Sequence, residues 1–267
     1  MTRELAGGKL LLDEPAEAVA RLTLSNLERR NALDHDVLDA LAEVLPELDR
    51  GIEIRCVIVT GAEGTFSAGY DIAGIPDDSF ERDAEALVAH PFHAAMEAVS
   101  AHPYPVVAAI DGACLGGGLE LAVRCDLRLA AEGAKLGMPP AKLGLIYGHT
   151  GLARFIDVIG VARTKELFLS GRTVSAARAE AIGLVNEVVG ETEIERAAVE
   201  LASEIAASAP LAARGNKHAI ETLALPRLTS EQERELVELR RSSFASEDLR
   251  EGIRAFAEKR KPRWQGR

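Results

Sequence analysis

The 267-residue chain is 47% hydrophobic and 27% charged, which is typical of a folded globular protein with little disorder. Its formal net charge of −11 argues against general binding to nucleic acids or anionic membranes, because neutralising phosphate groups requires clustered Lys and Arg. The three cysteines lack CxxC spacing and no apolar stretch has the length of a signal peptide or a membrane span, so we expect no disulfide framework, no zinc knuckle and a cytoplasmic location.

The first half of the chain alternates predicted strands and helices, which is the order of an α/β fold. Alternating or continuous apolar runs indicate the strands, and apolar residues at helical spacing indicate the helices. In chain order we predict two strands within 9–24, a helix at about 35–48 capped by Asp34, a strand at 54–60, a helix at 81–102, a strand at 106–110, a helix at 119–125 and a strand at 127–129.

The second half is predicted to change character near residue 195. Residues 132–151 are expected to be loop, followed by helices at 152–159, 164–169 and 175–183 and a strand at 184–189. From there the pattern is helical, at 194–208, 211–223, 230–244 and 247–259. We therefore predict one boundary, between an α/β core at 1–195 and a helical region at 196–267.

The stretch at 105–129, PVVAAIDGACLGGGLELAVRCDLRL, is the centre of the predicted structure. Its glycine cluster at 116–118 follows a buried strand and opens a helix, where unpaired backbone N–H groups can bind an anion or a developing negative charge. Glu120 lies three residues after Gly117, on the same helical face. Two interpretations remain open at this point: an acid/base group beside an oxyanion donor, or close helix–strand packing with Glu120 exposed.

A second glycine loop, GTFSAGYDI, follows the strand at 54–60. Two such loops after apolar strands favour a shared ligand site beyond the carboxyl ends of the strands. Other motifs are absent: the glycine cluster has neither GxGxxG spacing nor a GK[ST] ending, and no GxSxG occurs.

Six blocks of the sequence resemble the crotonase (enoyl-CoA hydratase/isomerase) superfamily, and their order and spacing make the resemblance specific. They cover nearly the whole chain and are ERRNAL (28–33), FSAGYDI (66–72), PVVAAIDGACLGGGLELAVRCD (105–126), KLGLIYGHTGLARFIDVIG (142–160), ELFLSGRTVSAARAEAIGLVNEVV (166–189) and AFAEKRKP (255–262).

The resemblance implies an α/β, ClpP/crotonase-like spiral of ββα repeats with a C-terminal helical trimerisation region. It further implies acyl-CoA thioester substrates, no metal, no cofactor beyond the CoA moiety, and a homotrimer or a dimer of trimers. By position, the N–H groups of Tyr70 and Gly117 would hold the thioester oxygen as an enolate forms, beside Glu120. The positions that would bind CoA are Arg29, Arg30, Ala32, Leu33, Ala68, Asp71, Ile72, Gly116, Phe256 and Lys259. The last two, on the C-terminal helix, would reach the CoA bound by a neighbouring subunit.

One position departs from the family pattern. Hydratases of this family use two glutamates; Glu120 matches the first, but Pro140 stands where the second is expected. The same block carries Tyr147, and PPAKLGLIY is similar to the equivalent stretch of methylmalonyl-CoA decarboxylases, which have a tyrosine there. Where those enzymes carry His after Ala-Gly in the first glycine loop, this chain has Tyr70.

The sequence therefore favours decarboxylation of a small 2-carboxyacyl-CoA, with Glu120 and Tyr147 as acid/base and carboxylate-positioning groups. The alternative reaction is hydration of a 2-enoyl-CoA by Glu120 without the second glutamate. The alternative outside enzymology is a silent acyl-CoA-binding scaffold.

Overall fold

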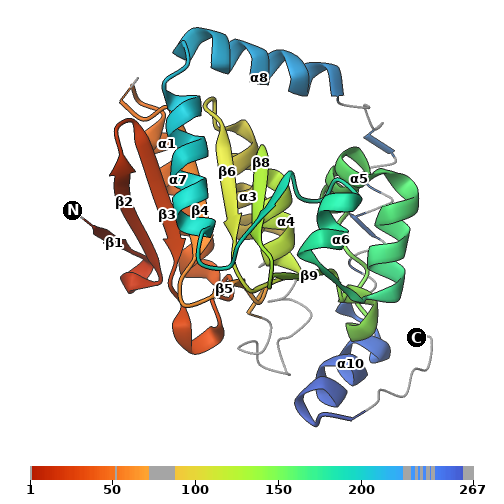
Figure 1. Cartoon of the computed structure of the whole chain (residues 1–267). Helices are drawn as coiled ribbons and strands as arrows, with labels where there is room; N and C mark the ends of the chain where they lie inside the picture. The colour runs from red at the N-terminus through yellow and green to blue at the C-terminus, as the bar shows by residue number, and fades with distance from the viewer. Residues whose placement is uncertain are drawn as a thin grey trace.

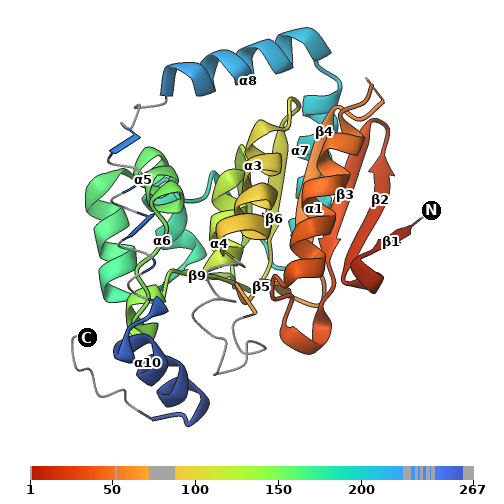
Figure 2. The ribbon, with the colours of Figure 1, turned by 180° about the vertical axis from the view of Figure 1, so that it is seen from behind.

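The computed structural model of the chain describes residues 2–51, 53–71, 88–224 and 244–260, together with positions 230, 231, 234, 237, 238 and 241. Part of the predicted helix at 81–102 and most of the predicted helix at 230–244 lie outside these residues. Figures 1 and 2 show a sheet with helices on both faces and a long helix, α8, across one end.

The larger sheet has seven strands in the order β1-β2-β3-β4-β6-β8-β11. An antiparallel edge, formed by β1, β2 and β3, continues into parallel pairs from β3 to β11. Its central strands β4 and β6 are almost wholly apolar, as expected for strands covered on both faces. The strands are β1 (Arg3–Leu5), β2 (Leu10–Ala16), β3 (Val19–Leu24), β4 (Cys56–Gly61), β6 (Val106–Ile110), β8 (Leu127–Ala131) and β11 (Glu187–Val189).

A smaller four-stranded sheet, in the order β10-β9-β7-β5, positions the glycine loops. Each of β4, β6 and β8 is followed by a short strand that enters this second sheet, where β5, β7 and β9 run parallel. The strands are β5 (Thr65–Ser67), β7 (Ala113–Leu115), β9 (Lys135–Gly137) and β10 (Thr173–Ser175). The repeated step from one sheet to the other places the turn after β5 beside the turn after β7.

Helices cover the two faces of the larger sheet unequally. Helix α7 (Ile194–Ala206) packs small side chains on one face, whereas α1 (His35–Leu48), α3 (His93–Ala101) and α4 (Gly117–Arg124) lie on the other, which carries the main core (Figures 1 and 2). Helix α1 begins where the Asp34 side chain accepts a hydrogen bond from Val37 N, as its sequence predicts. Preceding α3, residues 88–92 form a π-helical turn.

The remaining helices are α5 (His149–Ser170), α6 (Ala176–Ala181), α8 (Pro210–Ala224) and α10 (Glu247–Ala257), with 3-10 turns at Ala6–Gly8, Leu27–Arg29 and Pro140–Leu143. Gly160 interrupts α5 with φ +73°, so the two predicted helices are two arms of one kinked element. Ser175 caps α6 as predicted, its hydroxyl accepting from Arg178 N. No helix among the described residues has the length and apolarity needed to cross a membrane.

The prediction of a loop at 132–151 was wrong in part. Three residues of it form β9, and Pro140–Leu143 forms a 3-10 turn. The short strand β7 was also missed; it lies between the predicted strand at 106–110 and the glycine cluster at 116–118. Three-residue strands carry too little local pattern to be recognised, because their partners come from distant parts of the chain.

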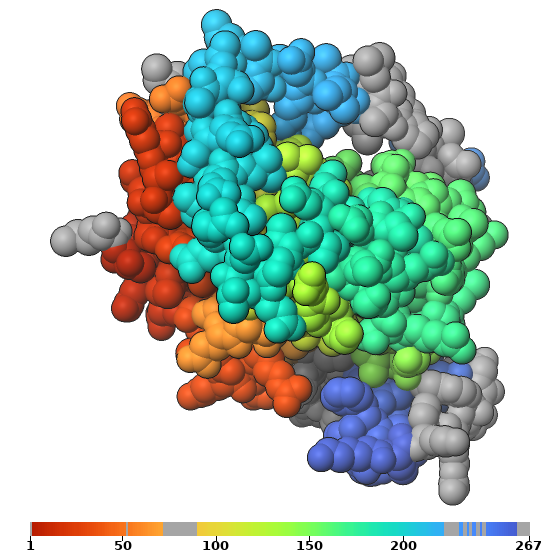
Figure 3. All heavy atoms as spheres, in the orientation of Figure 1, coloured from red at the N-terminus to blue at the C-terminus, as the bar shows by residue number. Residues whose placement is uncertain are grey.

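Helices α8 and α10 continue the chain beyond α7. Figure 3 shows α8 bridging one edge of the molecule, and its Leu211 and Ile220 are exposed. Lys217 fixes this helix to the body of the protein by donating hydrogen bonds to Asp126 Oδ2 at 2.8 Å and Tyr104 O at 3.3 Å. The boundary at 195 and the trimerising role of the helical region stay predictions.

Candidate active site

The two glycine loops touch. A methyl group built on Gly69 would lie 2.8 Å from Leu115 O and 3.3 Å from Gly117 N, so only glycine permits this approach. Gly69 also has φ +100°, a conformation that side-chain-bearing residues rarely adopt. Gly118 packs equally closely on Ser67, whose hydroxyl accepts a hydrogen bond from Gly69 N at 3.1 Å. The predicted convergence of the loops on one place is therefore present in the fold.

Gly117 begins helix α4, where its N–H has no acceptor within the helix and the positive end of the helix dipole lies. Tyr70, the next residue after Gly69, lies against this point: its ring atoms are 3.2 Å from where a Gly117 methyl would stand. The ring also packs edge-on against Phe92, with centroids 4.3 Å apart. The backbone of both predicted oxygen-binding residues is thus at the junction of the loops.

Glu120 lies in the first turn of α4 and is 2% exposed, which excludes the interpretation of an exposed helix carboxylate. Arg124, one helical turn further, donates to Glu120 Oε1 through Nη2 at 3.0 Å and Nε at 3.3 Å. The sequence analysis missed Arg124, although the i, i+4 spacing of opposite charges was a signal for it.

Tyr147 faces Glu120 from the segment before α5. A methyl group on Gly151 would lie 2.5 Å from Glu120 Oε2 and 2.7 Å from Tyr147 Cε1, so this glycine makes room for both side chains. Gly151 was also missed, and no local signal identifies it. The Tyr147 ring packs against Phe168 with centroids 5.4 Å apart, and Phe168 packs against Phe155.

Burial raises the pKa of the Tyr147 phenol well above its usual value, and the negative charge of Glu120 and the nearby Tyr70 raise it further. The phenol is therefore protonated at neutral pH and available as a hydrogen-bond donor. Among the described residues its buried hydroxyl makes no hydrogen bond of full geometry, but the Glu120 carboxylate and the Tyr70 hydroxyl are close enough to interact with it and favour its neutral form. A buried phenol that is not fully hydrogen-bonded keeps the capacity to donate to a ligand.

The loop at 28–33 lies alongside the first glycine loop, as the resemblance implies. Leu33 N donates to Gly69 O at 2.8 Å, Ala68 N to Arg30 O at 3.0 Å and Asp71 N to Leu33 O at 3.2 Å. Ala32 and Leu33 are buried, whereas Arg29 and Arg30 are exposed, with Arg29 Nε 3.8 Å from Asp71. Asn31 joins the two loops: its side-chain amide donates to Ala62 O and Thr65 O.

The positions of the other predicted residues do not test their roles. Gly116, with φ +52°, donates its N–H to Gly137 O at 3.0 Å. Pro140 is buried in the turn on which α10 packs, where Gly252 fits closely against Leu143. Phe256 on α10 is 78% exposed, Lys259 just beyond it is also exposed, and Ile72 lies outside the described residues. The CoA-binding roles of these residues stay predictions.

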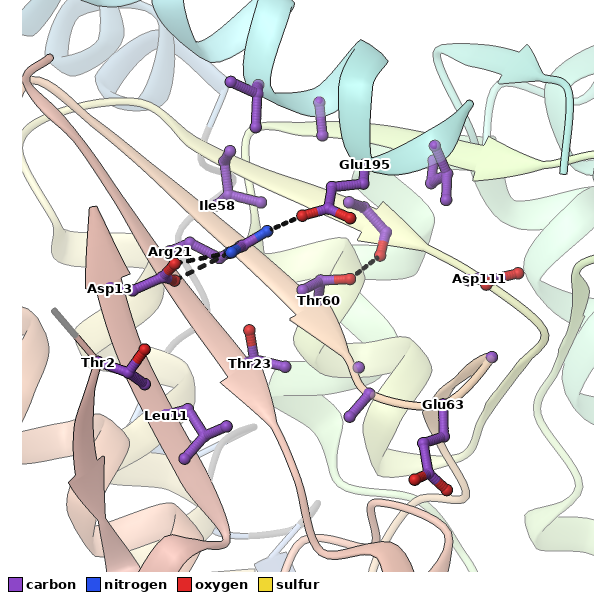
Figure 4. Close-up of a pocket in the computed structure, with 17 residues that line it drawn as sticks. Thr2, Leu11, Asp13, Arg21, Thr23, Ile58, Thr60, Glu63, Asp111 and Glu195 are labelled. Atoms are coloured by element: carbon purple, nitrogen blue, oxygen red, sulfur yellow. Dashed lines mark hydrogen bonds and ion pairs between the residues drawn. The ribbon is translucent and has the colours of Figure 1, made fainter. Parts of the chain in front are cut away.

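A separate pocket of about 410 Å³ lies on the α7 side of the larger sheet (Figure 4). Figure 4 shows Arg21 between Asp13 and Glu195, and Arg21 makes two hydrogen bonds to Asp13 at 2.9 and 2.7 Å. None of the predicted site residues lines it. Arg21, the cation among its described lining residues, is already paired with Asp13 and Glu195.

The arrangement of Gly117, Tyr70, Glu120 and Tyr147 suits chemistry at a carbonyl group. Backbone donors at the loop junction can bind an oxygen on which charge develops, while a carboxylate and a neutral phenol stand beside it. The aromatic and apolar surroundings lower the local dielectric and strengthen these interactions.

Comparison with known proteins agrees with this arrangement. A family model described as enoyl-CoA hydratase/isomerase matches residues 14–267. A Mycobacterium tuberculosis protein named "Probable enoyl-CoA hydratase echA8" is 38% identical, over 95% of this chain and 97% of its own length.

Two kinds of solved structure superpose on the chain. A methylmalonyl-CoA decarboxylase in complex with 2-nitronate-propionyl-CoA is 30% identical, with a TM-score of 0.88 and coverage of 97% of this chain and 99% of its own. An enoyl-CoA hydratase from Bacillus anthracis is 34% identical, with a TM-score of 0.77 and coverage of 97% and 100%. The chain therefore belongs to the enoyl-CoA hydratase/isomerase family of acyl-CoA enzymes and has the crotonase fold.

Proposed function

We propose that the protein decarboxylates a small 2-carboxyacyl-CoA of the methylmalonyl-CoA type through a thioester enolate. The observation that carries this proposal is Tyr147, a buried phenol that stands beside Glu120 and is held in its protonated, hydrogen-bond-donating form. Pro140, at the position of the second hydratase glutamate, has no side-chain group that can transfer a proton. Among the described residues, the site thus holds a hydrogen-bond donor for a substrate carboxylate and has no carboxylate at the position of the second hydratase glutamate.

The reaction breaks the bond between the α-carbon and the carboxylate. CO2 leaves, and the electron pair passes through the α-carbon to the thioester oxygen, forming the enolate. The N–H groups of Gly117 and Tyr70 bind that oxygen, each contributing about 3–4 kcal/mol to the stabilisation of the transition state. A proton from water, relayed by the Glu120 carboxylate, then reaches the α-carbon and completes the product.

Tyr147 orients the departing carboxylate in this scheme. Its protonated hydroxyl donates a hydrogen bond, while Phe168 and the ring of Tyr147 itself form an apolar wall. An apolar surrounding raises the free energy of a bound carboxylate relative to neutral CO2, which favours departure. The overall superposition on a decarboxylase, at a TM-score of 0.88 against 0.82 and 0.77 for two enoyl-CoA hydratase-type proteins, is a further argument for decarboxylation.

Hydration of a 2-enoyl-CoA is the second candidate. It is favoured by the name of the 38% identical relative and by the presence of Glu120, which would activate water alone or with Tyr147. A silent acyl-CoA-binding scaffold is the candidate outside enzymology. In that case the buried Glu120 would have no chemical role.

Parallel incubations of the purified protein with methylmalonyl-CoA and with crotonyl-CoA separate these candidates. We expect propionyl-CoA and CO2 from the first, and a slower reaction or none with the second. Glu120→Gln should reduce turnover of methylmalonyl-CoA. Product from crotonyl-CoA alone would replace decarboxylation by hydration, and full turnover in Glu120→Gln would remove Glu120 from the mechanism.

A further inference from the structure

A buried ion pair underlies the acid/base group of the site. Arg124 binds Glu120 Oε1 with two of its nitrogens, while Oε2 lies toward Gly151 and the Tyr147 ring. The side chains of Glu120 and Arg124 are 3% and 11% exposed, so solvent screens their attraction little. Of the two carboxylate oxygens, the guanidinium holds one and leaves the other toward the site.

A second arginine holds the helix that carries Gly151 against the helix of this pair. Arg154 donates to Val123 O at 3.1 Å and so fixes α5 on α4. Asp157, also on α5, is exposed; burial raises the pKa of its carboxyl, and Arg154 and Arg124 oppose that rise. The carboxylate that borders Tyr147 is Glu120.

We infer that Arg124 sets the charge of the acyl site so that it accepts a negatively charged acyl group. This inference rests on the proposed function, because it concerns a substrate that carries its own carboxylate. Without Arg124, that carboxylate would approach a second, uncompensated carboxylate in a poorly solvated place, which is strongly unfavourable. Arg124 acts through Glu120 and is a positioning and specificity-determining residue; it need not touch the substrate.

The test compares the binding of two CoA derivatives that are not turned over: 2-carboxypropyl-CoA, which is anionic in its acyl part, and propyl-CoA, which is neutral there. The ratio of their Kd values at pH 8.5 is measured by calorimetry. We expect Arg124→Gln to weaken the anionic compound relative to the neutral one by about tenfold to a hundredfold, as an uncompensated like charge in a partly buried site would. Arg124→Lys, which keeps the charge, should stay within a few-fold of the wild type.

Two further variants exclude a merely structural effect. Glu120→Gln leaves Arg124 as an unpaired cation and should shift the ratio about tenfold in the opposite direction, toward the anionic compound. The double variant Arg124→Gln/Glu120→Gln is neutral at both positions and should return the ratio to the wild-type range. A direct contact between Arg124 and the substrate would not give this recovery, and neither would general damage to the fold.

The inference remains testable even if Arg124→Gln folds poorly. Glu120→Gln is expected to shift the Kd ratio toward the anionic compound, and the double variant is expected to restore the wild-type ratio. An unchanged ratio in Glu120→Gln, or a double variant as unselective as Arg124→Gln, would overturn the inference. If the wild type decarboxylates methylmalonyl-CoA but the Kd ratio is the same in the wild type and in all variants, only the inference about Arg124 fails. If the wild type neither binds 2-carboxypropyl-CoA nor turns over methylmalonyl-CoA, the proposed function fails with it.

Discussion

The candidate site has two walls of different construction. The backbone wall consists of Gly69, Tyr70, Gly116 and Gly117, where main-chain atoms of two loops touch. The side-chain wall consists of Glu120, Arg124, Tyr147 and Phe168, contributed by α4, by α5 and by the segment that precedes α5. In the proposed reaction, the first wall donates hydrogen bonds to the thioester oxygen. The second wall selects which further group the acyl part of the substrate carries.

The two walls also differ in how they tolerate change. The backbone wall is tightest at Gly69, where a single added methyl group would collide with main-chain atoms. In the side-chain wall the close neighbours are ends of side chains, which rotate or ionise differently when a partner changes. We therefore expect substitutions in the first wall to abolish all chemistry, and substitutions in the second to alter rate and selectivity.

The largest effect is expected from Gly69→Ala. The added methyl group would lie 2.8 Å from Leu115 O, in a backbone conformation that alanine disfavours. The two loops must then separate, and the N–H groups of Tyr70 and Gly117 no longer point at one oxygen. We predict a fall of roughly 10³-fold or more in kcat/KM, measured by steady-state kinetics with methylmalonyl-CoA.

Gly7→Ala is the matched control. Gly7 also has positive φ, at +64°, but its methyl group would meet nothing within 4 Å. It should lose about 1 kcal/mol of stability and no activity. Equal kinetic losses in the two variants would show that strain alone, and no oxygen-binding geometry, explains the first result.

Tyr147→Phe tests the side-chain wall without changing its shape. The buried hydroxyl makes no hydrogen bond of full geometry among the described residues, although Glu120 and Tyr70 lie close enough to interact with it, so its removal should change the free energy of unfolding by no more than about 1 kcal/mol in either direction. Decarboxylation should fall roughly 10- to 100-fold, because the substrate carboxylate loses its donor. Urea unfolding and kinetics on the same preparation check both statements; undiminished decarboxylation would remove Tyr147 from the mechanism.

Gly151→Ala should disturb the same wall more gently. Its methyl group would press on Glu120 Oε2 and the Tyr147 ring, at 2.5 and 2.7 Å, while alanine suits the α5 backbone. We predict a loss of about tenfold in kcat with a folded protein, since misplacing reacting groups by a fraction of an ångström lowers the rate. Gly215→Ala, on α8 with nothing within 4 Å, should be fully active; a Gly151→Ala enzyme as active as this control would mean that the packing between Glu120 and Tyr147 is not needed.

The smallest effect on catalysis is expected at His102, outside both walls at the end of α3. Burial lowers the pKa of its imidazole from 6.5 to about 4, and nearby Lys217 contributes to the shift. Between these pH values the unfolded chain binds more protons than the folded one, so stability is complete above pH 6.5 and declines as the pH falls toward 4. The contribution amounts to about 3 kcal/mol.

Denaturant unfolding across this pH range should therefore show a shallower pH dependence in His102→Gln than in the wild type. Turnover at pH 8 should be unaltered, because His102 is already neutral there. The same pH dependence of stability in the two proteins would contradict the lowered pKa of His102.

The two walls also differ in what the sequence could predict. A glycine cluster after an apolar strand indicates a tight backbone turn for steric reasons alone, so the cluster at 116–118 and Glu120 were singled out by local reasoning. The donor role of Tyr70 came from the family resemblance. Gly151 could not be found, because its importance comes from a contact between α4 and the segment around α5. Arg124 had a local signal, its spacing from Glu120, but an arginine at a helix end is usually solvated, and only burial gives the pair its significance.

The helices and strands also differ in whether the local sequence predicts them. Long apolar runs such as β4 and β6 and capped helices such as α1 were predicted correctly. The three-residue strands β7 and β9 were not, because pairing in the smaller sheet, and not local propensity, forms them.

The most direct test of the central claim is the affinity of a stable enolate mimic. In a 2-nitronate analogue of propionyl-CoA the negative charge is shared between the nitro oxygens, which take the place of the departing carboxylate, and the conjugated thioester oxygen, whereas propionyl-CoA is neutral at both places. If the junction of the two glycine loops binds a developing oxyanion, calorimetry should find the nitronate bound at least about 100-fold more tightly, as for transition-state analogues in general. Equal dissociation constants for the two compounds would contradict the account.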